Sequence, residues 1–210
     1  IQQLGMYFIC VLLALFIHLA VVYGSVVQFV AKRSFVWFLK GFAPAMSVAF
    51  STSSSSAVLP VSLETAQRKL GIRKSISSFV QPLGATVNMD GTAIMQGVAT
   101  VFIAQLSGID LSVGQMATVV IIATIASIGT AGVPGVGLVM LAMVLTAVGL
   151  DPAAIGIILG IDRLLDMTRT VVNITGDATI ALVLDHHADV KEGKFIKGKS
   201  KYVDGKIVNK

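Results

Sequence analysis

The chain has 210 residues, of which 55% are hydrophobic and 13% are charged, and its mean hydropathy is +0.86. These values lie outside the range of ordinary soluble domains, so they exclude that class and indicate an integral membrane protein. The net charge is +5, yet charged side chains are missing from residues 1–31, 41–63, 91–109 and 111–150. Uncharged apolar runs of about 18 residues or more are typical of membrane spans.

Residues 2–26 are predicted to form a full membrane span that ends before Lys32 and Arg33. The run is too long for the apolar part of a signal peptide and lacks a basic start. His18 on this span is expected to be a buried or interfacial residue. Because the first residue is not Met, we expect the sequence to begin inside a longer protein.

Residues 34–71 are predicted to form a helical hairpin with a serine tip, which is the STSSSS run of residues 51–56. Serine and threonine compete for backbone hydrogen bonds, so they favour caps and turns over a lipid-facing helix. Pro60 is placed to open the second arm. The first arm is short for a bilayer core of about 30 Å, which favours a hairpin that crosses only halfway.

Residues 74–107 are predicted to form a broken helix. The NMDGT break, residues 88–92, places Asn88, Asp90 and Gly91 in the middle of an otherwise apolar segment. Exposed backbone groups at this depth are tolerated only where they line a cavity or are buried in protein. Broken helices with free carbonyls and a carboxylate are typical of cation sites in secondary transporters.

Residues 113–149 are predicted to form a second hairpin, because residues 111–150 would make a helix of about 60 Å, twice the membrane core. Its turn is the glycine loop, SIGTAGVPGVG at residues 127–137. The loop lacks the Gly-Lys-Ser/Thr of a phosphate loop, which argues against nucleotide binding. Two roles stay open for it: a hinge that caps a ligand, or a plain turn between helices.

Residues 152–180 are predicted to form a polar membrane helix. At about 100° per residue, spacings of four, three, four and four place five polar side chains on one narrow face. Charged groups facing lipid would cost roughly 2.5 to 3.5 kcal/mol each, so this face must line a polar site. The polar stripe consists of Asp162, Asp166, Arg169, Asn173 and Asp177.

Basic residues fall in alternate connections, near residues 32–40, 68–74 and from 191 onward. The positive-inside rule places these segments together on the cytoplasmic side. A hairpin followed by an interrupted polar helix then occurs twice with opposite orientation, in 34–107 and 113–180, which is typical of secondary transporters. We therefore expect an all-α membrane protein with a membrane-embedded transport domain at 1–185 and a charged, partly disordered cytoplasmic tail at 186–210.

Four ordered motifs resemble the signatures of the dicarboxylate/amino acid:cation symporter family, the glutamate transporters. They are TSSSSAVLP at 52–60, NMDGT at 88–92, SIGTAGVPGVG at 127–137 and DMTRTVVNITGD at 166–177. The resemblance covers roughly residues 1–185. It implies a transport domain with two re-entrant hairpins in an inverted repeat, which moves as an elevator against a homotrimeric scaffold built by upstream helices.

The same resemblance implies an acidic amino acid, aspartate or glutamate, as the substrate. Arg169 would hold the substrate side-chain carboxylate, for which the guanidinium fork is suited, and Asp166 would pair with the substrate ammonium. The serine tip and the glycine loop would hold the α-carboxylate. The implied substrate ligands are Ser54, Ser55, Ser56, Thr92, Gly132, Val133, Gly137, Asp166, Arg169, Thr170 and Asn173.

Three cation sites are implied as well, for Na⁺ or H⁺, and oxygen ligands suit a hard cation. The implied ligands are Gly84, Thr86, Asn88, Asp90, Ser127, Ile128, Thr130, Asn173 and Asp177. We expect no cofactor other than the coupling cation, no enzymatic activity and no nucleic-acid partner. The expected location is the cell (inner) membrane, as a multi-pass protein in contact with the lipid bilayer.

The sequence departs from the family at two positions. Members commonly carry an arginine just before the serine triplet or just after the first aspartate of the last motif, where this chain has Ser53 and Met167. Arg163 either compensates for that charge or snorkels to the membrane surface.

Two further functions compete with the symporter. An intramembrane aspartyl protease would use Asp90 and Asp177 as two carboxylates that share a proton, although ITGD lacks the first glycine of the Gly-x-Gly-Asp motif. A C4-dicarboxylate carrier would use the same anion clamp for a substrate without an amine.

Overall fold

The computed structural model describes residues 2–192, 200–203 and 206–209, and most of these residues are helical. A short antiparallel pair of strands, β1 (Ser200–Val203) and β2 (Lys206–Asn209), follows the last helix. The helices are α1 (Gln2–Ile17), the π-helical η1 (His18–Tyr23) and η2 (Val26–Val30), α2 (Phe35–Thr52), α3 (Ser55–Arg68), α4 (Lys74–Val87), α5 (Asp90–Leu106), α6 (Val113–Ile128), α7 (Val136–Ala147), the 3₁₀ turn η3 (Pro152–Ile157) and α8 (Leu159–Lys191).

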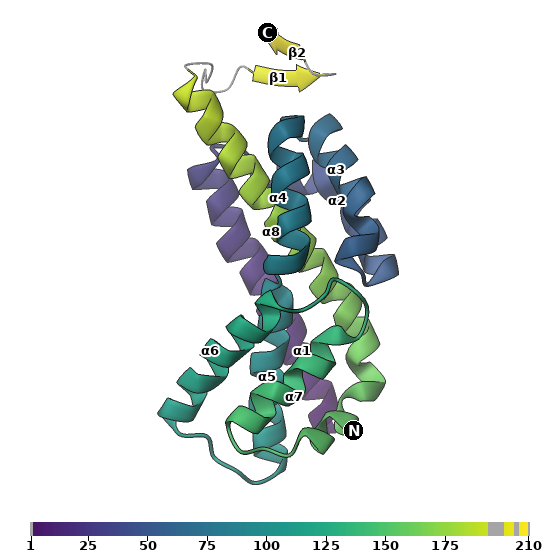
Figure 1. Ribbon diagram of the computed structural model, residues 1–210, viewed down its shortest axis with the longest axis vertical. Helices are drawn as coiled ribbons and strands as arrows, with labels where there is room; N and C mark the ends of the chain where they lie inside the picture. The colour runs from purple at the N-terminus through teal and green to yellow at the C-terminus, as the bar shows by residue number, and fades with distance from the viewer. Residues whose placement is uncertain (1, 193–199, 204–205, 210) are drawn as a thin grey trace.

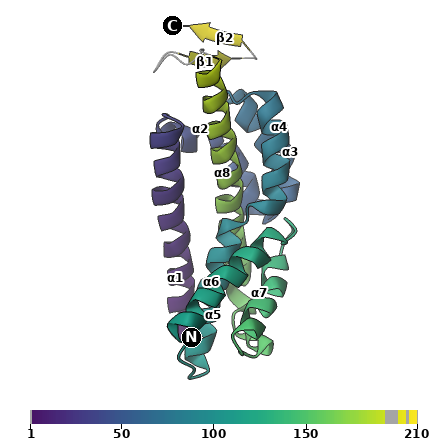
Figure 2. The same ribbon diagram turned by 60° about the vertical axis from the view of Figure 1, so that its left-hand side comes forward.

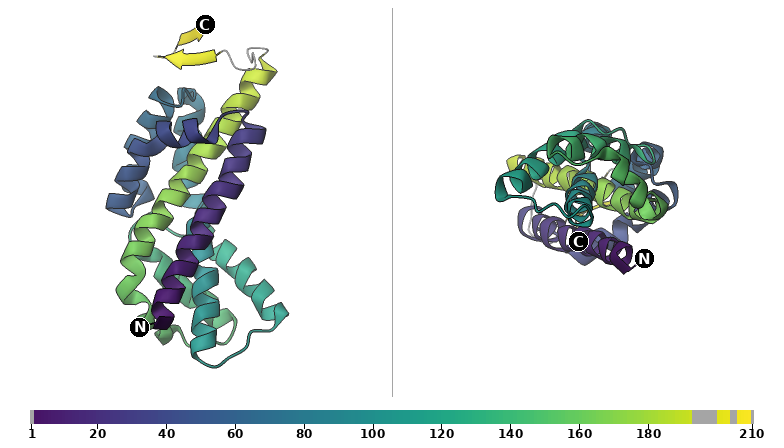
Figure 3. Two further views of the ribbon diagram at one scale, coloured as in Figure 1. Left: turned by 180° about the vertical axis from the view of Figure 1, so that it is seen from behind. Right: turned by 90° about the horizontal axis from the view of Figure 1, so that it is seen from below.

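Two long helical segments organise the molecule. Figures 1 and 2 show two segments running along its length, α1 continued by η1 and η2, and α8, with α2, α3 and α4 at the end near the C-terminus. Helices α5, α6 and α7 surround the other end, where the N-terminus lies, and the view from behind in Figure 3 shows α1 beside α8. The predicted breaks therefore fall at the middle of the molecule, between its two ends.

Serine caps explain where several of these helices begin. Ser54 accepts a hydrogen bond from the backbone N–H of Ala57 at 3.2 Å and so starts α3, and Ser112 starts α6 through a reciprocal capping box with Gln115. Within the serine tip, the helical structure is therefore interrupted only at Ser53 and Ser54, and Ser53 adopts a left-handed conformation. The prediction that Pro60 opens the second arm was wrong, because the cap places the helix start five residues earlier and Pro60 lies inside α3.

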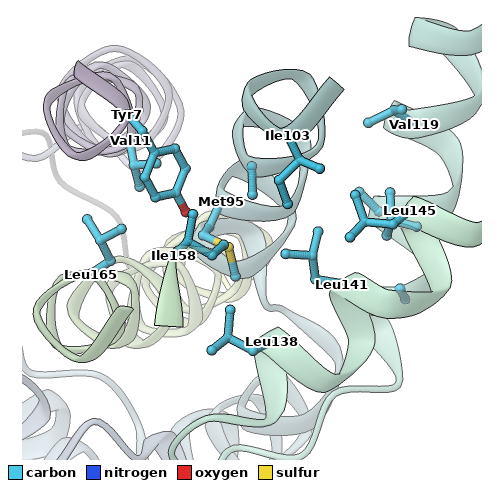
Figure 4. Packing of buried hydrophobic residues seen from close by; sticks show 14 of the residues in the cluster. Tyr7, Val11, Met95, Ile103, Val119, Leu138, Leu141, Leu145, Ile158 and Leu165 are labelled. Atoms are coloured by element: carbon cyan, nitrogen blue, oxygen red, sulfur yellow. The ribbon is translucent and has the colours of Figure 1, made fainter. Parts of the chain in front are cut away.

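The buried apolar side chains form two separate cores. Figure 4 shows the first, between α1, α5, α6, α7 and the beginning of α8, with Tyr7, Met95, Ile103, Leu141 and Leu165 among its members. The second joins α2, α3, α4 and the later part of α8, and includes Phe38, Phe42, Val58, Ile174 and Leu182. The polar stripe of α8 lies along the stretch where the helix passes from one core to the other.

Helix α8 continues to Lys191, beyond the predicted end at residue 180 and into the predicted disordered tail. The reason is Arg73, at the start of α4, which pairs with Asp185 at 2.8 Å, Asp189 at 2.8 Å and Glu192 at 2.9 Å. These acids are four and three residues apart, so they share one helical face. The rest of the predicted tail, residues 193–199, 204–205 and 210, lies outside the described residues.

The surface of the described residues carries much apolar area. Large side chains are exposed along the outer faces of α1 and α6, including Phe16, Val113 and Ile125. Two stretches, Gln2–Val30 and Phe35–Thr52, are long and apolar enough to cross a membrane, and α6 and α7 are apolar but shorter. An exposed apolar surface of this kind suits lipid or another protein segment rather than water.

Candidate functional site

The five side chains of the polar stripe are all buried. Arg169, which is 1% exposed, lies between two carboxylates: its Nη2 donates to Asp166 Oδ1 at 2.8 Å, and its Nη1 is 3.3 Å from Asp162 Oδ1. A buried charge is tolerated only when it is paired, so the two aspartates are what hold this arginine in the apolar phase. The group carries one positive and two negative formal charges.

The arginine is nevertheless short of hydrogen-bond partners. Its Nε and Nη1 groups and Asp162 Oδ1 are buried and make no hydrogen bond within the described part of the chain. Unsatisfied buried donors are rare in folded proteins and need a reason. A guanidinium whose Nε and Nη1 groups make no hydrogen bond can still donate to a carboxylate ligand, and it can grip that ligand in bidentate geometry once Nη2 leaves Asp166.

The serine tip and the glycine loop touch each other beside the polar stripe. The hydroxyl of Ser54 donates to the carbonyl of Gly132 at 2.7 Å, and the backbone N–H of Ser56 donates to the same carbonyl at 3.1 Å. A Cβ on Gly132 would lie 2.9 Å from Ser56 Oγ, 3.0 Å from the carbonyl oxygen of Ala85 and 3.1 Å from Ser55 Cβ, so a side chain there would crowd this approach. The two turns, separated by 78 residues in sequence, form one surface.

The glycine loop also reaches the stripe directly. The backbone N–H of Gly135, which has a φ of +80° that favours glycine, donates to Asp166 Oδ2 at 3.0 Å. The carbonyl of Gly137 accepts from the side chain of Gln96 at 3.1 Å, and a Cβ on Gly137 would meet Arg169 at 3.3 Å. Val133, the next residue of the loop after Gly132, is 48% exposed.

The NMDGT break faces the second half of the stripe. Asn173 Oδ1 accepts from the backbone N–H of Gly91 at 2.8 Å, and its Nδ2 lies 3.4 Å from Thr92 Oγ1. Asn88 donates to Asp177 Oδ1 at 3.0 Å. Asp177 also packs so closely against Gly84 of α4 that a side chain at that glycine would overlap its carboxylate. The break thus contacts α8 through side chains of both elements.

Asp90, the first residue of α5, is held from a different direction. Its Oδ2 accepts from the Tyr23 hydroxyl at 2.8 Å and lies 3.2 Å from His18 Nε2. Asp90 and Asp177 therefore have separate partners and make no carboxylate pair. This arrangement disfavours the aspartyl protease, whose two acids must share a proton.

Four of the remaining candidates donate to backbone carbonyls three or four residues earlier in the chain. Thr170 donates to the carbonyl of Asp166 at 2.9 Å, and Thr130 donates to that of Ala126 at 2.9 Å. Ser127, near the end of α6, donates to the carbonyl of Thr124, and Thr86, near the end of α4, donates to that of Leu83. Thr86 and Ile128, the last residue of α6, are exposed. Among the described residues, no three His, Cys, Asp or Glu side chains gather as metal ligands.

Sequence reasoning gave no role to several side chains in this region. Tyr23 and Gln96 were missed, and Asp162 belonged to the stripe without being assigned as a ligand. The sequence signals for them are weak: a glutamine within an apolar segment, and a tyrosine five residues after His18. Arg163 is exposed and turned away from the stripe, which favours the snorkelling role over compensation.

Known proteins are similar to this chain over the residues that form the site. A family model described as the sodium:dicarboxylate symporter family matches residues 1–187 of the chain. The chain belongs to the sodium:dicarboxylate symporter family. The matched region contains all four sequence motifs and every residue of the candidate site, and the family agrees with the resemblance seen in the sequence.

Individual members of the sodium:dicarboxylate symporter family are similar to the chain over most of its length. Excitatory amino acid transporter 3 of Mus musculus is 49% identical over 177 residues, 84% of this chain and 34% of that protein. Excitatory amino acid transporter 4 of Mus musculus is 44% identical, with 88% and 33% covered, and excitatory amino acid transporter of Caenorhabditis elegans is 42% identical, with 89% and 37% covered. The chain thus spans about a third of the length of these relatives. The family and these relatives are transporters, not enzymes.

Proposed function

We propose that the protein containing this chain is a secondary active symporter that takes up acidic amino acids together with Na⁺. The observation that carries the proposal is Arg169, buried with unsatisfied donors at the place where the serine tip, the glycine loop and the NMDGT break meet. Membership of a sodium:dicarboxylate symporter family supports both the anionic substrate and the cation. The names of the relatives support an amino acid as cargo.

The substrate would exchange partners with the stripe. Arg169 and Asp166 now bind each other, so a substrate carboxylate on the arginine and a substrate ammonium on the aspartate would replace one ion pair by two. The α-carboxylate would lie between Ser54–Ser56 and Gly132–Gly137, with Thr92, Thr170 and Asn173 beside the ligand. The contact between Gly135 and Asp166 would tie closure of the glycine loop to an occupied site.

The need for an ammonium separates this proposal from the C4-dicarboxylate carrier. Succinate offers two carboxylates but nothing for Asp166, which would remain a buried, unpaired acid when Arg169 is occupied. Leaving one partner of a buried ion pair uncompensated costs roughly 3 to 5 kcal/mol. Aspartate or glutamate is therefore favoured over a simple dicarboxylate.

The coupling cations would bind at the NMDGT break and the glycine loop. One site combines Asp177 with oxygens of Gly84, Asn88 and Asn173, a second uses Asp90 with Asn88, and a third uses oxygens of Thr86, Ser127, Ile128 and Thr130. The burial of Asp177, which is 3% exposed, supports a cation there, because an isolated carboxylate is costly in an apolar interior. The family name supports Na⁺ rather than H⁺.

Transport would follow an elevator mechanism in the cell membrane. Residues 1–185 would form the moving domain, with 34–71 and 113–149 as re-entrant hairpins in an inverted repeat and 186–210 on the cytoplasmic side. The contact between the two hairpin tips supports half-crossing hairpins, and for the second hairpin the short apolar helices α6 and α7 support it as well. Upstream helices would form the scaffold of a homotrimer.

The test is uptake of labelled aspartate by the full-length protein in liposomes. We expect an inward Na⁺ gradient to drive accumulation, unlabelled glutamate or aspartate to compete, and succinate to compete weakly. Accumulation driven equally well without any cation gradient, or strong competition by succinate, would contradict the proposal. An H⁺ gradient in Na⁺-free buffer is the comparison that separates the two coupling ions.

Replacing Asp177 by Asn tests the first cation site. The amide keeps the shape and can still accept from Asn88, but it removes the negative charge that a cation needs. We expect the Na⁺ concentration for half-maximal uptake to rise at least about tenfold, a loss of roughly 1.4 kcal/mol in binding. The preference for aspartate over neutral amino acids should stay unchanged, and an unaltered Na⁺ response would rule out this ligand role.

A further inference from the structure

A π-helical turn in the first span brings two side chains onto Asp90. On an α-helix, residues five apart differ by about 140° in direction. In η1 (His18–Tyr23) the hydrogen bonds run from i to i+5, so its first and last residues lie on one face. Their rings contact edge to face at 4.7 Å, and both reach Asp90 Oδ2, His18 at 3.2 Å and Tyr23 at 2.8 Å.

The Tyr23 hydroxyl also touches α8 next to Asp177. Tyr23 is buried, and a Cβ on Gly176 would overlap both its hydroxyl and the amide nitrogen of Asn88. The Asn88 amide in turn donates to Asp177 at 3.0 Å. One hydroxyl therefore lies in the wedge between the NMDGT break and α8, with Asp90 on one side and the Asn88–Asp177 bond on the other.

Both donors converge on the same oxygen of Asp90. Hydrogen bonds to Oδ2 stabilise the ionised carboxylate and fix its rotamer, while Oδ1 keeps its lone pairs for a cation. Preorganised ligands bind more tightly because less ordering remains to be done on binding. π-helical turns inside longer helices occur frequently at functional sites. Proline and glycine are absent from η1 itself, and the Gly24–Ser25 pair follows it directly.

We propose that Tyr23 and His18 are positioning residues for the coupling cation at Asp90, and that Tyr23 links this cation site to the one at Asp177. The inference rests on the proposed Na⁺ coupling and deepens it. It assigns a functional role to two side chains of the first span, in which the sequence predicted only a buried or interfacial His18. Cation binding at either carboxylate would then be sensed at the other through one buried hydroxyl.

The test compares Tyr23→Phe with the wild type in the full-length protein. The ring and its packing remain, and only the hydroxyl is lost. Hydrogen bonds to charged groups are among the stronger ones in proteins, so we expect the Na⁺ concentration for half-maximal aspartate uptake to rise about tenfold or more and its Na⁺ dependence to become less steep. The KM for aspartate at saturating Na⁺ should change less than about twofold. Ser25→Ala is the matched control, since Ser25 donates only to carbonyls of its own helix, Val21 and Val22.

A second pair of variants covers the case in which Tyr23→Phe disturbs folding. His18→Gln keeps a side-chain N–H that can reach Asp90 and should retain Na⁺ dependence, whereas His18→Leu should weaken it as Tyr23→Phe does. Equal behaviour of the Gln and Leu variants, or an unchanged Na⁺ response in Tyr23→Phe, would overturn the proposal.

A binding measurement separates this inference from the proposed transport function. Na⁺ alone should raise the unfolding temperature of the purified wild-type protein, and the shift should be smaller in Tyr23→Phe at equal Na⁺. Equal shifts in the unfolding temperature of the wild type and of Tyr23→Phe would contradict the positioning role even if transport is Na⁺-driven. A clear shift in the wild type without Na⁺-driven uptake would instead contradict the proposed function and leave the cation site standing. No Na⁺ shift in the wild type would contradict both.

Discussion

Replacing Arg169 by Met should abolish uptake of aspartate and glutamate. The variant removes the only cation of a buried cluster and leaves Asp162 and Asp166, 4% and 8% exposed, without a counter-charge. Breaking a buried ion pair in this way costs roughly 3 to 5 kcal/mol, and the substrate carboxylate loses its bidentate partner at the same time. Uptake of labelled acidic amino acids into liposomes measures the loss, and a neutral amino acid serves as second substrate.

Arg163→Met is the matched control, because this arginine lies on the same helix with its side chain exposed. It should keep acidic uptake within about twofold of the wild type. Combining Arg169→Met with Asp162→Asn restores the charge balance and so separates loss of folding from loss of the clamp. The double variant should be produced and purified like the wild type and still fail to take up aspartate. Acidic uptake by either Arg169 variant would show that the substrate is held elsewhere.

The helices and their interruptions could be predicted because each has a local cause in the sequence. Charge-free apolar runs, the serine run at residues 51–56 and the flexible residues of the NMDGT break act over a few positions, and the periodicity of the polar stripe defines one face of α8 without any tertiary information. Burial of the whole stripe followed from the cost of charges in the apolar phase. The substrate and cation assignments came from the resemblance, and they remain proposals until they are measured.

What the sequence did not reveal depends on contacts between distant segments. The end of α8 is set by Arg73, more than 100 residues away, which neutralises acids that in isolation indicate a solvated tail. The π-helical turn has no residue signature, and the contacts of His18 and Tyr23 with Asp90 join residues about 70 positions apart. The role of Gln96 likewise becomes visible only in its hydrogen bond to the carbonyl of Gly137, 41 residues away. Local patterns locate elements, whereas the partners of buried polar groups require the fold.

The glycine at position 84 should be as sensitive as the charged residues. Alanine in the interior of α4 would ordinarily stabilise the helix by about 0.5 to 1 kcal/mol. Here the added methyl would overlap the carboxylate of Asp177 and approach its Cβ at 3.1 Å. The side chain must therefore rotate away, which breaks its bond with Asn88 and removes the charge from the cation site. We expect Gly84→Ala to raise the Na⁺ requirement for uptake at least about tenfold, as Asp177→Asn does.

Gly97→Ala in α5 provides the comparison for this variant, since a Cβ there meets no atom within 4 Å. It should leave Na⁺ dependence unchanged and keep or slightly raise the unfolding temperature, which follows from helix propensity alone. Gly84→Ala carries the same gain in propensity, so any difference between the two variants reports the displaced carboxylate. Adding Gly84→Ala to Asp177→Asn should cause little further loss in Na⁺ affinity, because both changes act on one site. Additive effects would mean that the glycine matters for packing and not for the cation.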